Sequence, residues 1–186
     1  RLLHYDAAGQ RLSSLEVGTA VHDLVVDTHD NLITLQADGV RGWDQNGDFR
    51  YFVAGSVISD DRIRLTLAAD GNIYFSRKKT YDVLKIRNEP HAFEPIGSEI
   101  WSAEVGHERS RDGRVIESAD GQSVFSVTDG KLYRLDAQFG FLRDSYAVTG
   151  KGFCDPTLSP DGKYLYVIGR GLSSLRTFLV SICVME

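Results

Sequence analysis

The sequence predicts an all-β protein, a β-propeller of four-stranded antiparallel blades, and three observations support this prediction. A turn followed at once by an apolar or β-branched run occurs four times in the 186 residues. The steps between successive turns are 40, 50 and 41 residues, and no helical periodicity separates them. A repeat of about 40 to 50 residues made of strands is typical of propellers, in which each repeat folds as one blade. The turns begin at Asp30, Asp70, Asp120 and Asp161.

A second landmark in the repeat is a strand that ends in an apolar residue followed by Asp. Its position predicts that the chain begins in the third strand of one blade, passes through three whole blades and ends after two or three strands of another. The pairs are Tyr5-Asp6, Trp43-Asp44 and Leu135-Asp136. The expected repeat units of this single domain are 19–57, 58–97, 98–150 and 151–186, with 1–18 completing the terminal blade.

Two arrangements of the chain ends are compatible with a chain that begins in the third strand of one blade. If 1–18 and 151–186 share a blade, the two segments close a ring of four blades and protect the sheet edges. Otherwise the chain is a fragment of a larger propeller with more blades.

The turn residues carry local predictions of their own. Asp38-Gly39 and Asp129-Gly130 each lie between two β-like runs, and glycine accepts the positive φ that a type I′ hairpin turn needs. The Asp residues of the four main turns are expected to bond the backbone two residues on, because Asx side chains form turns in this way. They are interpreted as turn formers rather than as a metal-binding set.

Composition restricts the class of protein. The content is 42% hydrophobic and 25% charged, as in a soluble globular domain, and no run approaches the roughly 18 apolar residues of a membrane helix. The net charge of −5 argues against non-specific nucleic-acid binding. Two cysteines, Cys154 and Cys183, make neither a metal framework nor a disulfide scaffold, and they are free thiols or one bridge. Position 1 is Arg, so a trimmed or processed start is expected.

Three segments carry a resemblance to a known group of proteins. The segment 21–49 looks like one NHL-type repeat, 67–75 is similar to its core, and 156–167 looks like the repeat of lactonase propellers. The chain therefore resembles the NHL and gluconolactonase-like propeller superfamily over most of its length. The segment 130–136 is also similar to the propellers of two-component sensors, which implies the sensor part of a larger receptor as one alternative.

The resemblance to the gluconolactonase-like enzymes implies one divalent cation on the propeller axis, held by Glu, Asn and Asp side chains. A hard cation such as Ca²⁺ suits these oxygen ligands. In this chain Asp155 is the candidate ligand under that interpretation, and the alternative is a turn residue before Pro156. The function implied is a metal-dependent, lactonase-like hydrolase.

The long third repeat suggests a different kind of site. Its surplus residues lie in or near 98–113, and insertions in repeat proteins often form loops on the binding face. Trp and Arg are enriched in interface hot spots, so the segment predicts a partner-binding loop. The alternative is a long solvated connection with Trp101 packed between blades. The candidate residues are Trp101, His107, Glu108, Arg109 and Arg111.

No catalytic motif is present in the sequence. It contains no nucleophile elbow, no His-Glu-x-x-His, no Cys-x-x-Cys and no phosphate-binding loop, so no catalytic residue is predicted. His22 and Asp23 are adjacent in a predicted strand and should point to opposite faces. The leading interpretation is a non-enzymatic module that binds a protein, peptide or glycan through one propeller face without a cofactor.

Overall fold

A computed structural model describes residues 1–54, 63–77, 82–89, 98–106, 114–128, 131–147, 151–170 and 177–183. For 151–155, 168–170 and 177–183 it gives the strands alone. Within these residues the secondary structure consists of strands and turns. The predicted all-β class is therefore confirmed.

The strands form three complete antiparallel sheets in which consecutive strands are neighbours. The first blade contains β3 (Val21–Val26), β4 (Leu32–Gln36), β5 (Gly39–Trp43) and β6 (Phe49–Ala54). The second contains β7 (Thr66–Leu67), β8 (Ile73–Arg77), β9 (Asp82–Ile86) and β10 (Glu99–Glu104). The third contains β11 (Val115–Glu117), β12 (Ser123–Thr128), β13 (Lys131–Asp136) and β14 (Leu142–Ala147).

A smaller sheet flanks the three blades on each side. Before them lies a two-stranded sheet, β1 (Leu2–Tyr5) and β2 (Arg11–Leu15). After them lies a three-stranded sheet, β15 (Lys151–Leu158), β16 (Tyr164–Arg170) and β17 (Thr177–Cys183). This sequence of two strands, three whole blades and three strands is the phase that the repeat predicts.

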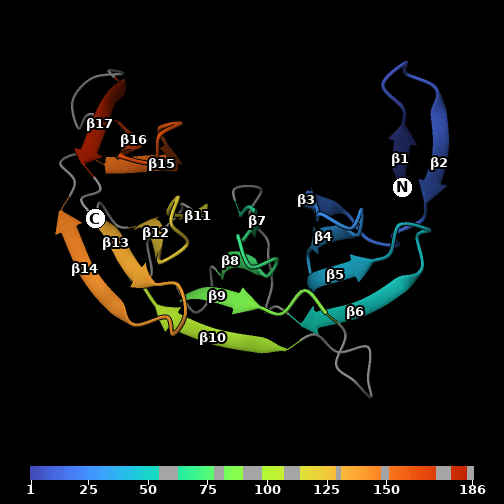
Figure 1. Ribbon diagram of the computed structural model, residues 1–186, viewed down its shortest axis with the longest axis horizontal. Coiled ribbons are helices and arrows are strands. Elements are labelled where there is room, and N and C mark those ends of the chain that lie inside the picture. The colour runs from blue at the N-terminus through green and yellow to red at the C-terminus, as the bar shows by residue number, and fades with distance from the viewer. Residues whose placement is uncertain are drawn as a thin grey trace.

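The five sheets stand side by side in an open arc (Figure 1). The fourth strands β2, β6, β10 and β14 lie on its convex side, and the first strands β3, β7 and β11 lie on its concave side. Among the described residues β1 pairs with β2 and β17 pairs with β16, without a ladder between the first and last sheets. The clasp that would close a four-bladed ring is therefore not formed, and the arrangement is that of the open fragment.

One predicted boundary differs from the structure. β10 pairs with β9, so Glu99–Glu104 is the outer strand of the second blade rather than the start of the third unit. Trp101 and Ala103 point toward the core while their neighbours are exposed, and this alternation is that of a half-buried strand. The first part of 98–113 is thus not a loop, and 107–113 lies outside the described residues.

The core lies between neighbouring sheets, and the inner strand β8 divides its side chains between two interfaces. On β8, Ile73 and Phe75 pack against the first blade, whereas Tyr74 packs against the third. This follows from the period of two along a strand. Each fully buried large apolar side chain contributes roughly 1.5–3 kcal/mol of transfer free energy, so the stacking of blades supplies most of the stabilisation.

The backbone hydrogen bonds of the four main turns show that the sequence-based alignment placed the first turn one residue too late. The N–H groups of Gly71, Gly121 and Gly162 each donate to the carbonyl three residues earlier, at 2.9–3.0 Å. In the first blade Asp30 makes this bond, to Asp27, at 3.2 Å. Asp30 therefore occupies the glycine position, with φ 61°, and is not the equivalent of Asp70.

The predicted turn chemistry holds for three of the four carboxylates. Asp70, Asp120 and Asp161 each accept a hydrogen bond from the backbone N–H two residues on, at 3.0, 3.0 and 3.2 Å. In the first blade Asp27 does this instead, because its Oδ1 accepts from the N–H of His29 at 2.8 Å.

The hairpin at Asp38-Gly39 differs from the expected type I′ turn. Gln36 pairs with Gly39, so the two loop residues are Ala37 and Asp38. Neither has the positive φ that a type I′ turn needs, since Asp30 is the one non-glycine residue with positive φ in the described part of the chain. Asp129-Gly130 lies outside the described residues.

Candidate functional site

A cleft opens between the second and third blades, at the ends of the blades where the main turns lie. Its volume is about 270 Å³. The second blade contributes Asp70, Asn72, Lys85 and Ile100 to its lining, and two turns of the third blade contribute Gly121, Ala137 and Gln138. The cleft thus brings together residues that are far apart in the sequence.

Lys85 is the buried charge of this cleft. It lies on β9 and is 5% exposed. Its Nζ is 2.7 Å from Asp70 Oδ2, donates to the Ala137 carbonyl at 3.1 Å and lies 5.1 Å from the centre of the Tyr74 ring. An unpaired buried ammonium would cost several kcal/mol, so this set of partners is what makes the burial tolerable.

The carbonyl of Ala137 joins the third blade to the second. It accepts hydrogen bonds from Lys85 Nζ at 3.1 Å and from Trp101 Nε1 at 3.2 Å, and it lies 3.4 Å from Tyr74 Oη, whose single proton has a nearer acceptor in Glu117. The Ala137 N–H donates to the Gln122 carbonyl at 3.0 Å. The turn that begins at Ala137 is therefore fixed on both sides of the interface.

The carboxylates of Glu117 and Asp70 are two further charged groups at the interface between the second and third blades. Glu117 accepts the Tyr74 hydroxyl at 3.0 Å and the Ala69 N–H at 2.6 Å. Burial, then the charge of Glu117, raises the pKa of Tyr74, so this phenol stays a donor. Burial also raises the pKa of Asp70, but the hydrogen bonds from Lys85 and Asn72 together with the charge of Lys85 outweigh it, and the net shift of this pKa is downward.

The same turn carries an exposed aromatic surface. The rings of Phe139 and Phe141 are stacked with their centres 6.0 Å apart, and the two residues are 57% and 70% exposed. The strand that follows, β14, is exposed at every residue, with Leu142 at 56% and Tyr146 at 44%. We call Phe139, Phe141, Leu142 and Tyr146 the aromatic rim.

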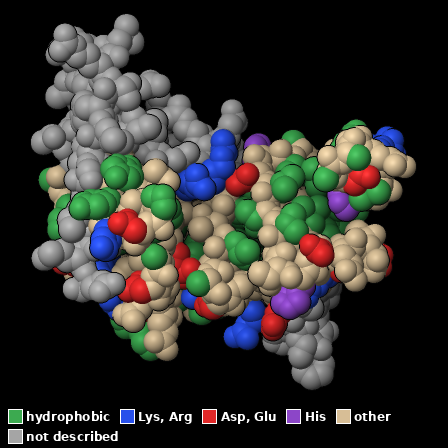
Figure 2. Space-filling view, turned by 45° about the horizontal axis from the view of Figure 1, so that its top comes forward, with side chains coloured by type: hydrophobic (Ala, Val, Ile, Leu, Met, Phe, Trp, Pro, Cys, Tyr) green, Lys and Arg blue, Asp and Glu red, His purple; other side chains and the backbone are tan. Residues whose placement is uncertain are grey.

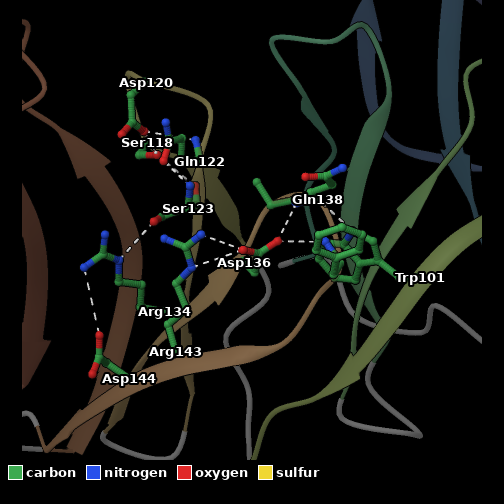
Figure 3. Close-up of polar contacts among 12 residues, drawn as sticks. Trp101, Ser118, Asp120, Gln122, Ser123, Arg134, Asp136, Gln138, Arg143 and Asp144 are labelled. Atoms are coloured by element: carbon green, nitrogen blue, oxygen red, sulfur yellow. Dashed lines mark hydrogen bonds and ion pairs between the residues drawn. The ribbon is translucent and has the colours of Figure 1, made fainter. Parts of the chain in front are cut away.

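Asp136 fixes the conformation of the turn from which the rim projects (Figure 3). Its Oδ1 accepts from the N–H groups of Gln138 and Phe139 at 2.9 and 2.8 Å, and its Oδ2 is 2.5 Å from Arg143. The hydrogen bond from Arg143 and those from the backbone lower the pKa of Asp136, so the carboxylate is charged at neutral pH.

Gly140 is required at the end of this turn. Its φ is 75°, and a Cβ atom at this position would lie 2.6 Å from Cε3 of Trp101. The backbone of the turn therefore lies directly on the indole ring, and a side chain would separate them.

Trp101, predicted as a possible partner contact, is a core residue. It is 8% exposed, its ring centre lies 5.8 Å from that of Tyr74, and its N–H donates to Ala137. Trp101 thus packs between blades, as in the alternative given above for the segment 98–113.

The remaining predicted site residues lie outside what the structure describes. His107, Glu108, Arg109 and Arg111 fall in an undescribed segment. Asp155 lies in β15, and Cys154 and Cys183 lie in β15 and β17, but their side chains are not described.

The described residues contain no group of three or more His, Cys, Asp or Glu side chains placed to hold a metal ion. Asp23 instead accepts the Leu65 N–H at 2.8 Å and joins the first and second blades. Over the same residues, no helix is long and apolar enough to cross a membrane.

Sequence reasoning missed the cleft and the rim, although signals for both exist. Lys85 stands at an inward position of the run Asp82–Ile86, all of which is buried, and a lysine there needs a partner. Phe139 and Phe141 lie where the Asp136 landmark predicts a turn, and two aromatic residues in a turn are unusual. The partners of Lys85 come from other strands, so spacing alone does not identify them.

No protein-family model and no curated protein matches this chain. Among solved structures, it is similar to a candidate 6-phosphogluconolactonase from Bacteroides uniformis, with a TM-score of 0.69 and 19% identity over 99% of this chain and 60% of that one. A streptogramin B lyase aligns with a TM-score of 0.66 and 14% identity over 99% and 62%. The β-propeller domain of Cps50 (Swd1) from Myceliophteria thermophila aligns with a TM-score of 0.65 and 18% identity over 86% and 52%.

The chain has a β-propeller fold. The resemblance to lactonase-type and streptogramin lyase-type propellers is confirmed at the level of fold, which is what identities of 14–19% support. The chain spans between 52% and 62% of the length of these three proteins. Because propellers host many unrelated activities, the fold does not name the function.

Proposed function

We propose that the chain is a binding module that recognises a protein partner through the aromatic rim. The exposed, stacked pair Phe139 and Phe141 carries this proposal. Contiguous exposed apolar surface marks interaction sites, and aromatic residues are enriched at the centre of protein interfaces. Phe139, Phe141, Leu142 and Tyr146 are four exposed, large apolar side chains on one turn and the strand that follows it.

The rigidity of the turn supports the same function. Asp136 holds the backbone of the turn through two N–H groups, and Gly140 rests on Trp101. A contact surface that is already in its bound conformation loses little conformational entropy on association. The rim therefore has the properties of a pre-organised anchor.

The charges around the rim favour recognition by apolar contact. Arg143 is paired with Asp136, and Arg134 lies 3.9 Å from Asp144. Figure 2 shows acidic and basic side chains interspersed with apolar ones on the face that it presents, rather than gathered into a patch of one sign. We therefore expect the partner to present apolar side chains and its binding to depend weakly on salt.

Site-specific crosslinking tests the proposal. A photo-crosslinking phenylalanine analogue replaces Phe141 in the organism that makes the protein, and a matched variant carries it at Phe49, another exposed aromatic position. We expect a specific adduct from position 141 and none of the same mass from position 49. The captured protein is then purified and titrated calorimetrically against the wild-type chain and against a Phe139→Ser, Phe141→Ser variant.

The double variant should bind the captured partner about thirtyfold more weakly, since truncating a hot spot costs about 2 kcal/mol or more. The Phe49→Ser variant should bind as the wild type does. Identical adducts from positions 141 and 49, or an unchanged affinity of the double variant, would contradict the proposal.

A metal-dependent lactone hydrolase is a second candidate, favoured by the similarity to the Bacteroides uniformis protein. Under this interpretation Asp155 contributes to a site for a divalent cation such as Ca²⁺. A thermal-shift titration with Ca²⁺, Mg²⁺, Mn²⁺ and Zn²⁺ against an EDTA-treated sample tests it. A ligand of the folded state raises the free energy of unfolding by about 2.7 kcal/mol at a hundredfold excess over its Kd. A shift that Asp155→Asn removes would support the hydrolase, and no shift with any cation would argue against it.

A further inference from the structure

We propose that the cleft between the second and third blades is a separate binding site for a neutral, polyhydroxylated ligand, namely one unit of a saccharide. The site is distinct from the aromatic rim, although both include the turn that follows Asp136. It does not depend on a protein partner, so it stands or falls independently of the proposed function.

The polar groups of the cleft match the chemistry of hydroxyl groups. A hydroxyl donates one hydrogen bond and accepts others, so a ring with neighbouring hydroxyls needs both donors and acceptors. The Asp70 carboxylate can accept beyond its contact with Lys85, and the Gln138 amide can both donate and accept. The Asn72 Oδ1 already accepts the Asn88 N–H at 3.3 Å, and Lys85 is bonded to Asp70 and Ala137. Among the described residues, the Gln138 side-chain amide makes no hydrogen bond, so it is available to a ligand.

The charges of the cleft are balanced, and this favours a neutral ligand. Lys85 and Asp70 lie 2.7 Å apart and neutralise one another. The Glu117 carboxylate nearby is already occupied by Tyr74 and Ala69. A charged ligand would have to compete with these internal partners and lose its own hydration, whereas hydroxyl groups exchange hydrogen bonds with water and protein at little cost.

The shape and lining of the cleft set the size of the ligand. Pockets for drug-sized ligands have volumes of about 300–1,000 Å³, and the cleft has about 270 Å³. A single small ring is therefore the expected occupant. Ile100 is partly exposed on the second-blade wall and offers an apolar contact for the C–H face of such a ring.

The test is an NMR titration of the ¹⁵N-labelled chain with D-glucose, D-galactose and D-mannose, and with D-gluconate and D-glucosamine as charged probes. We expect saturable shifts for at least one neutral sugar, with a dissociation constant in the millimolar range. The shifted amides should cluster at Asn72, Gly121 and Gln138. The two charged probes should bind more weakly than this neutral sugar.

Two glutamine variants make the test specific. Gln138→Ala should weaken binding of that sugar about fivefold or more, the effect of one lost hydrogen bond. Gln45→Ala, an exposed glutamine on the turn between β5 and β6, should leave the affinity unchanged. The proposal is overturned if no neutral sugar shifts the cleft amides, if Gln138→Ala binds as tightly as the wild type, or if gluconate or glucosamine binds more tightly than every neutral sugar.

Discussion

The hydroxyl of Tyr51, on the first blade, donates to Oδ1 of Asn88, on the second, at 2.7 Å and without solvent access to the phenol. At the next interface the Trp101 N–H donates to the Ala137 carbonyl at 3.2 Å. Both aromatic residues come from the outer strand of their blade, and both reach the turn after the third strand of the next. The two interfaces thus use one geometry with different chemical groups.

Removing the Tyr51 hydroxyl should destabilise the fold. In Tyr51→Phe the buried Asn88 Oδ1 loses its donor while Asn88 Nδ2 keeps its bond to Asp27 at 2.9 Å. A buried acceptor left without a partner costs about 1–3 kcal/mol. Urea unfolding followed by circular dichroism measures the change, with Tyr146→Phe on the exposed rim as the matched control. An unchanged midpoint for Tyr51→Phe would contradict the assigned role.

Asp30→Gly should stabilise the protein. Asp30 is held at φ 61°, where the other three main turns have glycine, and left-handed backbone costs a non-glycine residue about 1 kcal/mol. The opposite change, Gly71→Ala at φ 81°, should destabilise by a similar amount, because nothing within 4 Å would touch the added Cβ. Thermal unfolding of the two variants should give shifts of opposite sign, and shifts of the same sign would refute the corrected register.

Gly140→Ala should cost more than a strained turn alone. The new methyl group would lie 2.6 Å from the Trp101 ring at a φ of 75°, so overpacking adds to backbone strain, for a total of about 2–4 kcal/mol. Gly9→Ala isolates the backbone part, since it has φ 80° and open space around it. Urea unfolding gives both values, and tryptophan fluorescence should change in Gly140→Ala only. Equal losses in the two variants would show that Trp101 is not in contact.

Stability should fall on acidification, partly through Asp27. Burial raises the pKa of this carboxyl, but hydrogen bonds from Asn31, His29 and Asn88 outweigh it and lower the pKa from the usual 3.8. A lowered pKa in the folded state means that Asp27 stabilises the fold above pH 3.8, and that this contribution is lost as the pH falls through the folded value.

The measurement for Asp27 is the urea midpoint between pH 7 and pH 3. Asp27→Asn should lower the midpoint at pH 7 and flatten its decline below about pH 4. A parallel decline in wild type and variant would exclude Asp27 as a contributor.

The sequence alone predicted the strands, their phase and the propeller class, because turns and strand periodicity are local. It misplaced Asp30 by one residue, since an aspartate there takes the conformation usually left to glycine. It placed Trp101 in a loop because the long third repeat was measured from turn to turn, and β10 lies within that span. Lys85 was not predicted, because its partners Asp70 and Ala137 lie far from it in the sequence. The rim was not predicted either, because the exposure of β14 follows from its outer position in the third blade.

The acceptor of the Trp101 N–H belongs to the main chain at Ala137, whereas the acceptor of the Tyr51 hydroxyl is the side chain of Asn88. A main-chain carbonyl survives any substitution that preserves the path of the turn. The Ala137 carbonyl therefore keeps its donors Lys85 and Trp101 while position 137 varies among small residues. The Tyr51 hydroxyl depends instead on one side-chain amide, so position 88 should tolerate far less variation.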